Sequence, residues 1–222
     1  MTGTTVKICG LQDVEVLKSL IQMPVDYTGF IFAKSRRQVT AEQAAELIEV
    51  LHSRPSTGRP ASVGVFLNPE REEIDEVLKR APLDFIQLHG QESPAFCDDL
   101  RRQYGVKVIK VLSLDPGGSE AHALKLNSYL NHIDVLLLDT HDPVYGGGSG
   151  ETFAWDQIPA YQNWSRSAGI PLMAAGGLTP ENVQTLVQSY APDGVDVSSG
   201  VESNGVKDIA KITAFVERVK GL

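Results

Sequence analysis

The sequence predicts an α/β protein with one closed architecture, a single (β/α)8 TIM barrel of parallel strands. Short apolar runs alternate with longer segments of helical period along all 222 residues. About eight such pairs of an apolar run and a helical segment occur, and α/β barrels of this chain length form a single domain. The last two apolar runs both end in loops of small residues, at 173–177 and 195–200. Because apolar strands joined by helices indicate a parallel sheet, we expect residues 1–222 to form one barrel domain.

The expected strands are the short apolar runs. They cover residues 5–9, 29–32, 62–67, 85–89, 106–112, 135–139, 171–175 and 194–198. The expected helices cover residues 13–22, 41–52, 69–80, 94–104, 120–131, 155–167, 180–189 and 207–220. A doubly wound open sheet is the alternative architecture, but Gly10-Leu11-Gln12 after the first strand lacks the glycine fingerprint of a dinucleotide site.

Composition narrows the classes of function. The net charge of -8 and the absence of basic runs longer than pairs such as Arg36-Arg37 argue against nucleic-acid binding. The first five residues carry neither the charged nor the apolar part of a signal peptide, and no stretch approaches a membrane span, so we expect a cytoplasmic protein. Cys9 and Cys97 lack metal-ligand spacing, so neither a disulfide framework nor a zinc site is indicated.

Strand alternation predicts which side chains face the barrel interior. The residues expected on the inner face are Lys7, Cys9, Gln87, His89, Lys110, Leu137, Asp139, Asp196 and Ser198. Those expected to face the helices are Val6, Ile8, Ile86, Leu88, Leu138, Val195 and Val197. Because buried charges must be paired, we expect Lys7, Lys110 and Asp196 to form an interior ion-pair network that closes the barrel.

Cys9 and Asp139 are the last residues of their strands, at the rim where barrel enzymes carry their chemistry. A lone cysteine is most often a packing residue, and that is our interpretation of Cys97. Cys9 differs because Lys7 lies one pleat below it, and a nearby cation favours the thiolate that would serve as a base. Asp139 either anchors the loop that follows it or acts as a general acid whose pKa is raised by burial.

Glycine-rich loops follow three of the expected strands. The loop after Asp139 contains Gly147-Gly148-Ser149-Gly150, which suits a lid that excludes water. The last two strands are followed by Gly176-Gly177 and by Ser199-Gly200, whose backbone N–H groups can bind a phosphate. Thr179 is expected to cap the helix after the first of these two loops. Loops after strands seven and eight form the usual phosphate site of TIM barrels.

Seven motifs occur in one order along nearly the whole chain. They are Val6-Lys7-Ile8-Cys9-Gly10, Gly29-Phe30-Ile31-Phe32 with Ser35-Arg36-Arg37, Val63-Gly64-Val65-Phe66-Leu67-Asn68, Gln87-Leu88-His89-Gly90, Leu138-Asp139-Thr140 with Gly147-Gly148-Ser149-Gly150, Ala175-Gly176-Gly177-Leu178, and Val195-Asp196-Val197-Ser198-Ser199-Gly200-Val201-Glu202. Together they resemble the phosphoribosylanthranilate isomerase family of tryptophan biosynthesis. One departure is an added glycine in Gly146-Gly147-Gly148, where the family's loop usually reads Gly-Gly-Thr/Ser-Gly.

The resemblance implies an Amadori rearrangement of N-(5-phosphoribosyl)anthranilate to 1-(2-carboxyphenylamino)-1-deoxyribulose 5-phosphate, with no metal and no cofactor. It implies Asp139 as the general acid that opens the ribose ring and Cys9 as the base that takes the proton from sugar carbon 2. Arg37 would grip the anthranilate carboxylate, and the backbone near Gly177 and Ser199-Gly200 would hold the phosphate. The only expected partner is this phosphosugar, bound by a monomer or a homodimer.

Some residue roles and functions stay open. Without the resemblance, Arg37 is a solvated arginine beside Arg36, and His89 is equally a substrate contact or a core histidine. The histidine-pathway aminoaldose isomerase performs the same rearrangement with aspartates at both catalytic strands, so Cys9 argues against it. A lyase with Lys110 as Schiff-base lysine would need that residue at the rim. A noncatalytic phosphate-binding scaffold is the alternative from a different class.

Overall fold

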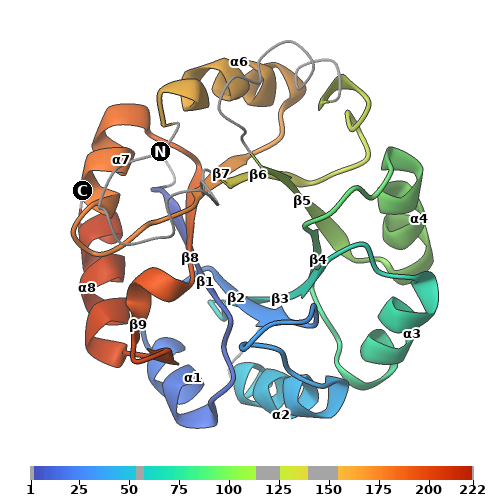
Figure 1. Ribbon diagram of the computed structural model, residues 1–222, viewed down its shortest axis with the longest axis horizontal. Helices are drawn as coiled ribbons and strands as arrows, with labels where there is room; N and C mark the ends of the chain where they lie inside the picture. The colour runs from blue at the N-terminus through green and yellow to red at the C-terminus, as the bar shows by residue number, and fades with distance from the viewer. Residues whose placement is uncertain (1–2, 54–57, 114–125, 140–154, 222) are drawn as a thin grey trace.

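The computed structural model describes residues 3–53, 58–113, 126–139 and 155–221, and within them eight parallel strands form a closed barrel (Figure 1). The strands are β1 (Thr5–Cys9), β2 (Tyr27–Ile31), β3 (Ala61–Phe66), β4 (Phe85–Leu88), β5 (Lys107–Ser113), β6 (Val135–Asp139), β7 (Leu172–Ala175) and β8 (Gly194–Val197). They follow one another around the barrel in chain order, and β8 pairs with β1. The predicted fold class is therefore confirmed.

Helices surround the barrel and connect its strands (Figure 1). They are α1 (Val14–Leu20), α2 (Ala41–His52), α3 (Arg71–Arg80), α4 (Pro94–Tyr104), α6 (Ile158–Ala168), α7 (Val183–Tyr190) and α8 (Ile209–Lys220). Several helix starts follow from local side-chain caps. Thr40 and Gln43 form a capping box at α2, and Ser93 accepts from the Phe96 N–H before Pro94 at the first turn of α4. None of the helices in the described ranges is long and apolar enough to cross a membrane.

Several helices begin later than the sequence predicts, and for α7 and α8 the local contacts show why. Helix α7 starts at Val183 because the Asn182 side chain bonds to the Thr179 N–H and the Gly177 carbonyl, which holds the preceding residues in a turn. Helix α8 starts at Ile209 because Lys207 belongs to a hairpin of β9 (Glu202–Ser203) and β10 (Val206–Lys207). Half of the helix predicted over 120–131 lies outside the described residues, and in the other half residues 126–127 are helical while 128–131 form turns.

The hairpin turn is formed by Asn204 and Gly205, which have positive φ values of 52° and 83°. Two consecutive residues of positive φ give the tight turn that matches the twist of antiparallel strands. Asp208 then caps α8 by accepting from the Ala210 and Lys211 N–H groups. The hairpin therefore fills the connection between β8 and α8, where sequence periodicity predicted only the helix.

Two apolar clusters lie on the two faces of the sheet. The inner cluster comprises Val63, Phe85, Ile109, Val111, Val135, Leu137, Met173 and Ala175. The outer cluster lies between the strands and the helices and includes all seven residues predicted to face that way, Val6, Ile8, Ile86, Leu88, Leu138, Val195 and Val197. Cys97 is fully buried in this outer cluster, which confirms that it is a packing residue.

The interior ion pair that closes the barrel joins Lys7 of β1 to Asp196 of β8, with 3.1 Å between Nζ and Oδ1. The prediction that Lys110 belongs to this network is wrong. Ile109 and Val111 line the apolar interior, so alternation turns Lys110 toward the helices. There its ammonium group lies 2.9 Å from the Glu92 carboxylate and bonds to the Leu88 and Gly90 carbonyls.

Four aspartates tie the strands together at their amino ends. Asp26, Asp84, Asp134 and Asp193 directly precede β2, β4, β6 and β8. Each carboxylate accepts the backbone N–H of a residue in the preceding strand, namely Val6 (2.7 Å), Ser62 (2.8 Å), Val108 (2.8 Å) and Leu172 (2.8 Å). The same bond thus repeats around the barrel and satisfies strand donors that would otherwise lack a partner. We call these four aspartate bonds the clamps. They hold the strands at their amino ends, so the loops at the carboxyl ends are not needed for this purpose.

We expect Asp134→Ala to lower the free energy of unfolding by about 2–3 kcal/mol, because it leaves the buried Val108 N–H without its acceptor and removes the Arg101 ion pair. Urea denaturation measures this change. The control is Asp99→Ala, which removes an exposed ion pair with Arg71 worth about 0–1 kcal/mol. Equal stability of the two variants would contradict the clamp's role.

Candidate active site

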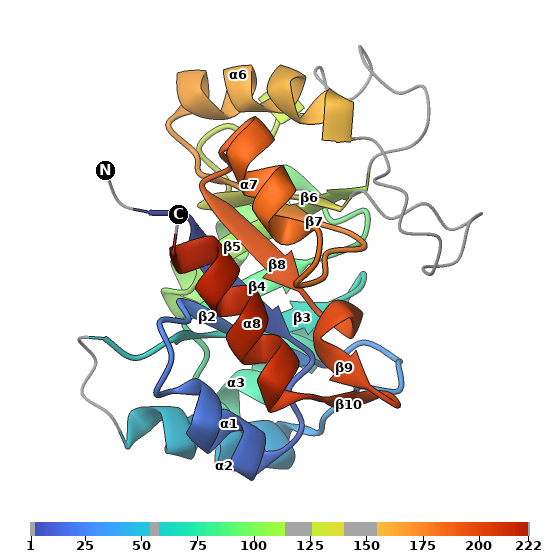
Figure 2. The same ribbon diagram turned by 90° about the vertical axis from the view of Figure 1, so that its left-hand side faces the viewer.

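The carboxyl ends of the strands converge at the end of the barrel where β9 and β10 lie (Figure 2). Cys9 ends β1 and Asp139 ends β6, three strands apart around the closed ring by way of β7 and β8. Lys7 and Leu137, two residues earlier in the same strands, face the interior, so alternation turns Cys9 and Asp139 inward as predicted. Both groups therefore border the mouth of the barrel from opposite parts of its rim.

Cys9 is closely packed. It is 6% exposed, and it pairs with Gly29 of the neighbouring strand β2. A Cβ atom added to Gly29 would lie only 2.7 Å from the Cys9 sulfur, so the glycine leaves the space that the thiol occupies. Ser198 donates a hydrogen bond of 3.2 Å to the Cys9 carbonyl and so ties the end of β1 to the loop after β8.

Lys7 lowers the pKa of the Cys9 thiol, as predicted, but the net shift of that pKa is upward. Burial raises the pKa of the Cys9 thiol, and Asp196 adds to this, while the cations Lys7 and Lys207 lower it by less. Burial of the thiol, which position in the sequence does not reveal, outweighs the cation, and the Asp196 carboxylate paired with Lys7 opposes it further. Burial therefore disfavours the Cys9 thiolate, the form that would act as a base.

His89 and Asp139 form a pair at the rim, with 3.4 Å between Nε2 and Oδ2. Their side chains are 35% and 22% exposed, so the interpretation of His89 as a core histidine is wrong. The carbonyls on both sides of His89 are those that bind the Lys110 ammonium. Lys110 therefore fixes the backbone that presents His89, although its own side chain lies on the other face of the sheet.

Arg37 is held by Glu202 rather than exposed to solvent. Its Nε and Nη2 atoms lie 2.5 and 3.0 Å from the two carboxylate oxygens of Glu202, and its side chain is 18% exposed. Arg36 and Lys207 bond to the same carboxylate at 2.6 and 2.8 Å. Although burial alone would raise it, hydrogen bonds from Arg37 and Lys207 bring the pKa of Glu202 to about 2. The solvated-arginine interpretation of Arg37 is wrong.

The two predicted phosphate loops touch each other. Gly176 and Gly177 after β7 have φ values of 94° and 62°, a left-handed conformation that glycine adopts without strain. After β8, Ser199 begins a short 3-10 helix, and a Cβ atom added to Gly200 would overlap the Leu178 carbonyl oxygen. The loop after β8 therefore packs so closely against the loop after β7 that only glycine fits at position 200.

The remaining predictions concern the lid loop and metal binding. The predicted lid residues Gly147, Gly148, Ser149 and Gly150 lie outside the described residues. In the part of the chain that the structure covers, no group of three or more histidine, cysteine, aspartate or glutamate side chains could hold a metal ion.

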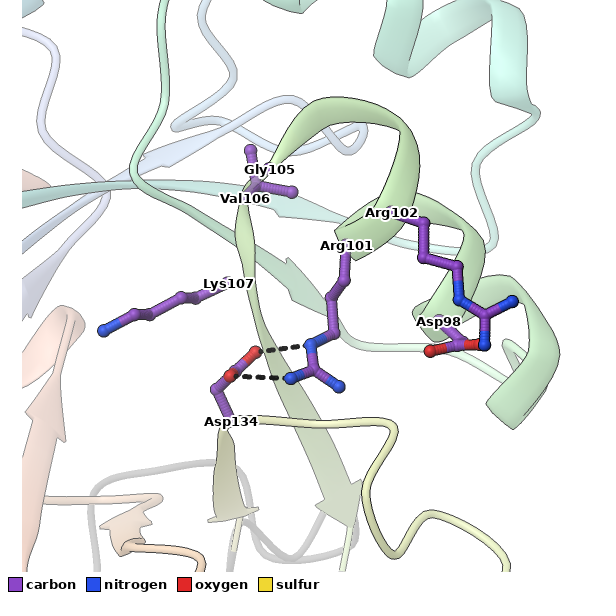
Figure 3. Close-up of a pocket in the computed structure, with 7 residues that line it drawn as sticks. All are labelled: Asp98, Arg101, Arg102, Gly105, Val106, Lys107 and Asp134. Atoms are coloured by element: carbon purple, nitrogen blue, oxygen red, sulfur yellow. Dashed lines mark hydrogen bonds and ion pairs between the residues drawn. The ribbon is translucent and has the colours of Figure 1, made fainter.

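A groove of about 400 Å³ lies at the amino end of β5, away from the rim (Figure 3). Its lining residues are Asp98, Arg101, Arg102, Gly105, Val106, Lys107 and Asp134. Arg101 points toward Asp134, and Arg102 lies beside Asp98 at 2.6 Å (Figure 3). Because these arginines pair with acids and Asp134 also clamps β5, the charges of the groove serve the stability of the barrel.

Comparison with known proteins shows to which family the chain belongs. The family model described as N-(5'phosphoribosyl)anthranilate (PRA) isomerase matches residues 6–218. The chain belongs to this family. A curated relative from Brevibacillus brevis, named N-(5'-phosphoribosyl)anthranilate isomerase, is 46% identical over 98% of this chain and 94% of its own length.

Solved structures of the PRA isomerase family superpose over the whole barrel. The enzyme from Thermotoga maritima has a TM-score of 0.80 and 35% identity, covering 99% of this chain and 100% of that one. A complex of the isomerase with reduced 1-(o-carboxyphenylamino)-1-deoxyribulose 5-phosphate has a TM-score of 0.78 and 33% identity at the same coverage. The barrel of this chain is therefore the barrel of the PRA isomerase family.

Sequence reasoning missed Glu202 and Lys207 as members of the site. Glu202 closes the last of the seven motifs, but nothing in its neighbours shows that its partner is Arg37, 165 residues earlier. The periodicity predicts Lys207 as the start of a helix, whereas it lies in β10. The available signal is an acid directly after the loop at Ser199-Gly200, because an acid that the fold buries must find cationic partners.

We expect alkylation of Cys9 by iodoacetamide to be slow at pH 7 and to rise about tenfold for each pH unit up to pH 9, because a raised pKa keeps the thiolate scarce over this range. Peptide mass spectrometry measures the rate, with the fully buried Cys97, whose pKa is about 12, as internal control. A rate that levels off below pH 8 would contradict the assigned direction.

Proposed function

We propose that this chain isomerises N-(5'-phosphoribosyl)anthranilate to 1-(2-carboxyphenylamino)-1-deoxyribulose 5-phosphate in tryptophan biosynthesis. The supporting observation is that the family match covers the barrel at residues 6–218 while Cys9 and Asp139 end β1 and β6 on the same rim. An aldose is converted to a ketose in this reaction by moving protons alone. One acid and one base on opposite sides of the sugar meet that requirement.

The first step is ring opening with Asp139 as general acid. Its protonated carboxyl group gives a proton to the ribose ring oxygen as the bond from that oxygen to carbon 1 breaks, and the anthranilate nitrogen forms a protonated Schiff base. His89 lies 3.4 Å from the same carboxyl group and borders it at the rim.

The second step is removal of the proton on carbon 2 with Cys9 as the base. The thiolate takes the proton, and the electron pair of the C–H bond forms the double bond of the enolamine while neutralising the Schiff-base nitrogen. Because the Schiff base is a cation, its formation beside Cys9 favours loss of the thiol proton to water and so opposes the effect of burial, which raises the pKa of Cys9. The enolamine then tautomerises to the ketone.

The charged ends of the substrate fit two parts of the rim. Arg37 lies against Gly10, next to Cys9, and its guanidinium suits the planar anthranilate carboxylate. The touching loops at Gly177 and at Ser199-Gly200 suit the phosphate, which takes backbone N–H groups. A lyase with Lys110 as its Schiff-base residue does not fit, because Lys110 faces the helices and pairs with Glu92.

We expect wild-type protein to consume phosphoribosylanthranilate generated in situ, seen as loss of its fluorescence. Cys9→Ser and Asp139→Asn should each lower kcat/KM by about a hundredfold or more, since each removes one proton-transfer group. Unchanged thermal unfolding is the control for folding. No turnover by folded wild type would contradict the isomerase, and full turnover by Cys9→Ser would place the base elsewhere.

We expect Gly177→Val to raise KM at least about tenfold by disturbing the phosphate loop. The matched control is Gly169→Val. Both glycines have left-handed φ values, 62° and 66°, and an added Cβ atom meets nothing within 4 Å at either one. Gly169 caps α6, away from the loops after β7 and β8. Equal KM values for the two variants would show that the loop does not bind the phosphate.

A further inference from the structure

Glu202 is the centre of a cluster of charged side chains. The proposed reaction gives a role to Arg37, one member of this cluster, but none to Glu202. Its side chain is 4% exposed, and three cationic side chains, Arg36, Arg37 and Lys207, bond to its carboxylate. One carboxylate among three cations leaves a local surplus of two positive charges. The cluster therefore stays attractive to an anion even though Glu202 is buried within it.

The contact between Glu202 and Arg37 fixes the plane of the guanidinium group. Two N–H groups on one edge of Arg37 meet both oxygens of the carboxylate at 2.5 and 3.0 Å. A guanidinium carries five N–H donors in a rigid fork, so this contact leaves donors for a second anion. Holding a long side chain in advance also removes the entropy that binding would otherwise cost.

The position of Arg37 relative to Cys9 follows from Gly10. A Cβ atom added to Gly10 would lie 2.6 Å from Arg37 Cδ and 3.3 Å from Ser198 Oγ. The arginine stem therefore crosses the chain directly after Cys9. Lys207 connects the same cluster to the loop after β8, because it bonds to the Ser198 carbonyl at 2.9 Å as well as to Glu202.

We propose that Glu202 is a positioning residue of the active site, which holds the Arg37 guanidinium ready to receive the substrate's aromatic carboxylate. This inference rests on the proposed isomerase function. Glu202 touches neither the sugar nor the reacting atoms and acts through Arg37. Its contribution is therefore to substrate affinity, while the proton transfers at Cys9 and Asp139 proceed as before.

The test is steady-state turnover of phosphoribosylanthranilate by Glu202→Gln. The amide keeps the size of the side chain but cannot accept both N–H groups of Arg37. We expect KM to rise about tenfold or more while kcat stays within about threefold. The matched control is Arg36→Gln, which removes a partner of Glu202 whose side chain is 59% exposed and leaves the Arg37 contact intact. That variant should change KM by less than about twofold.

A double-mutant cycle separates positioning from general damage. If Glu202 acts through Arg37, Glu202→Gln should change kcat/KM by less than about twofold in an Arg37→Ala background. An undiminished effect in that background, or an unchanged KM in Glu202→Gln, would overturn the proposal. Equal KM increases in Arg36→Gln and Glu202→Gln would also overturn it, because they would indicate bulk charge. If Glu202→Gln fails to fold, Glu202→Asp, which shortens the reach to Arg37, replaces it in the cycle.

Wild-type turnover measured alongside separates this inference from the function on which it rests. A wild type that turns over while Glu202→Gln keeps its KM refutes the positioning role alone. A folded wild type without turnover refutes the isomerase itself, and with it the role assigned to Glu202.

Discussion

The ion pair between Lys7 and Asp196 is the interaction on which both the barrel and its site depend. It joins the first strand to the last at the seam of the closed sheet, in an interior that is otherwise largely apolar. Removing one partner would leave a buried charge uncompensated, at a cost of about 3–5 kcal/mol. The pair also lies one pleat below Cys9, where Lys7 lowers and Asp196 raises the pKa of the thiol. One contact therefore both closes the barrel and acts on the expected base.

The two ends of the barrel use acidic side chains in different ways. At the amino end, Asp26, Asp84, Asp134 and Asp193 bind strand N–H groups, which fixes the register of neighbouring strands. At the carboxyl end, Glu202 binds Arg37 at the rim, and Glu92 binds Lys110 on the outer face of the sheet, behind the backbone that presents His89. Loops can then vary at the rim without loosening the sheet beneath them, as expected of a barrel whose chemistry lies at one face.

Much of this arrangement is predictable from local sequence, because strand alternation and helix caps are local properties. The inward direction of Cys9 and the seven outward residues follow from counting alone. The predicted inward direction of Lys110 is wrong because both of its apolar neighbours, Ile109 and Val111, face the interior. Apolar residues on both faces of a strand leave its alternation ambiguous. The contacts of Arg37 with Glu202 and of His89 with Asp139 join distant parts of the chain. No local pattern encodes such pairings, since they depend on how the loops fold over the rim.

The most direct test of the account is a crystal structure of this protein with the reduced product analogue bound. The account predicts the Cys9 sulfur within about 3–3.5 Å of sugar carbon 2, the distance of a reactive pair. Asp139 should lie on the opposite side of the sugar, the carboxylate on Arg37, and the phosphate between the loops at Gly177 and Gly200. A sugar whose carbon 2 lies away from Cys9, or a phosphate bound elsewhere, would contradict it.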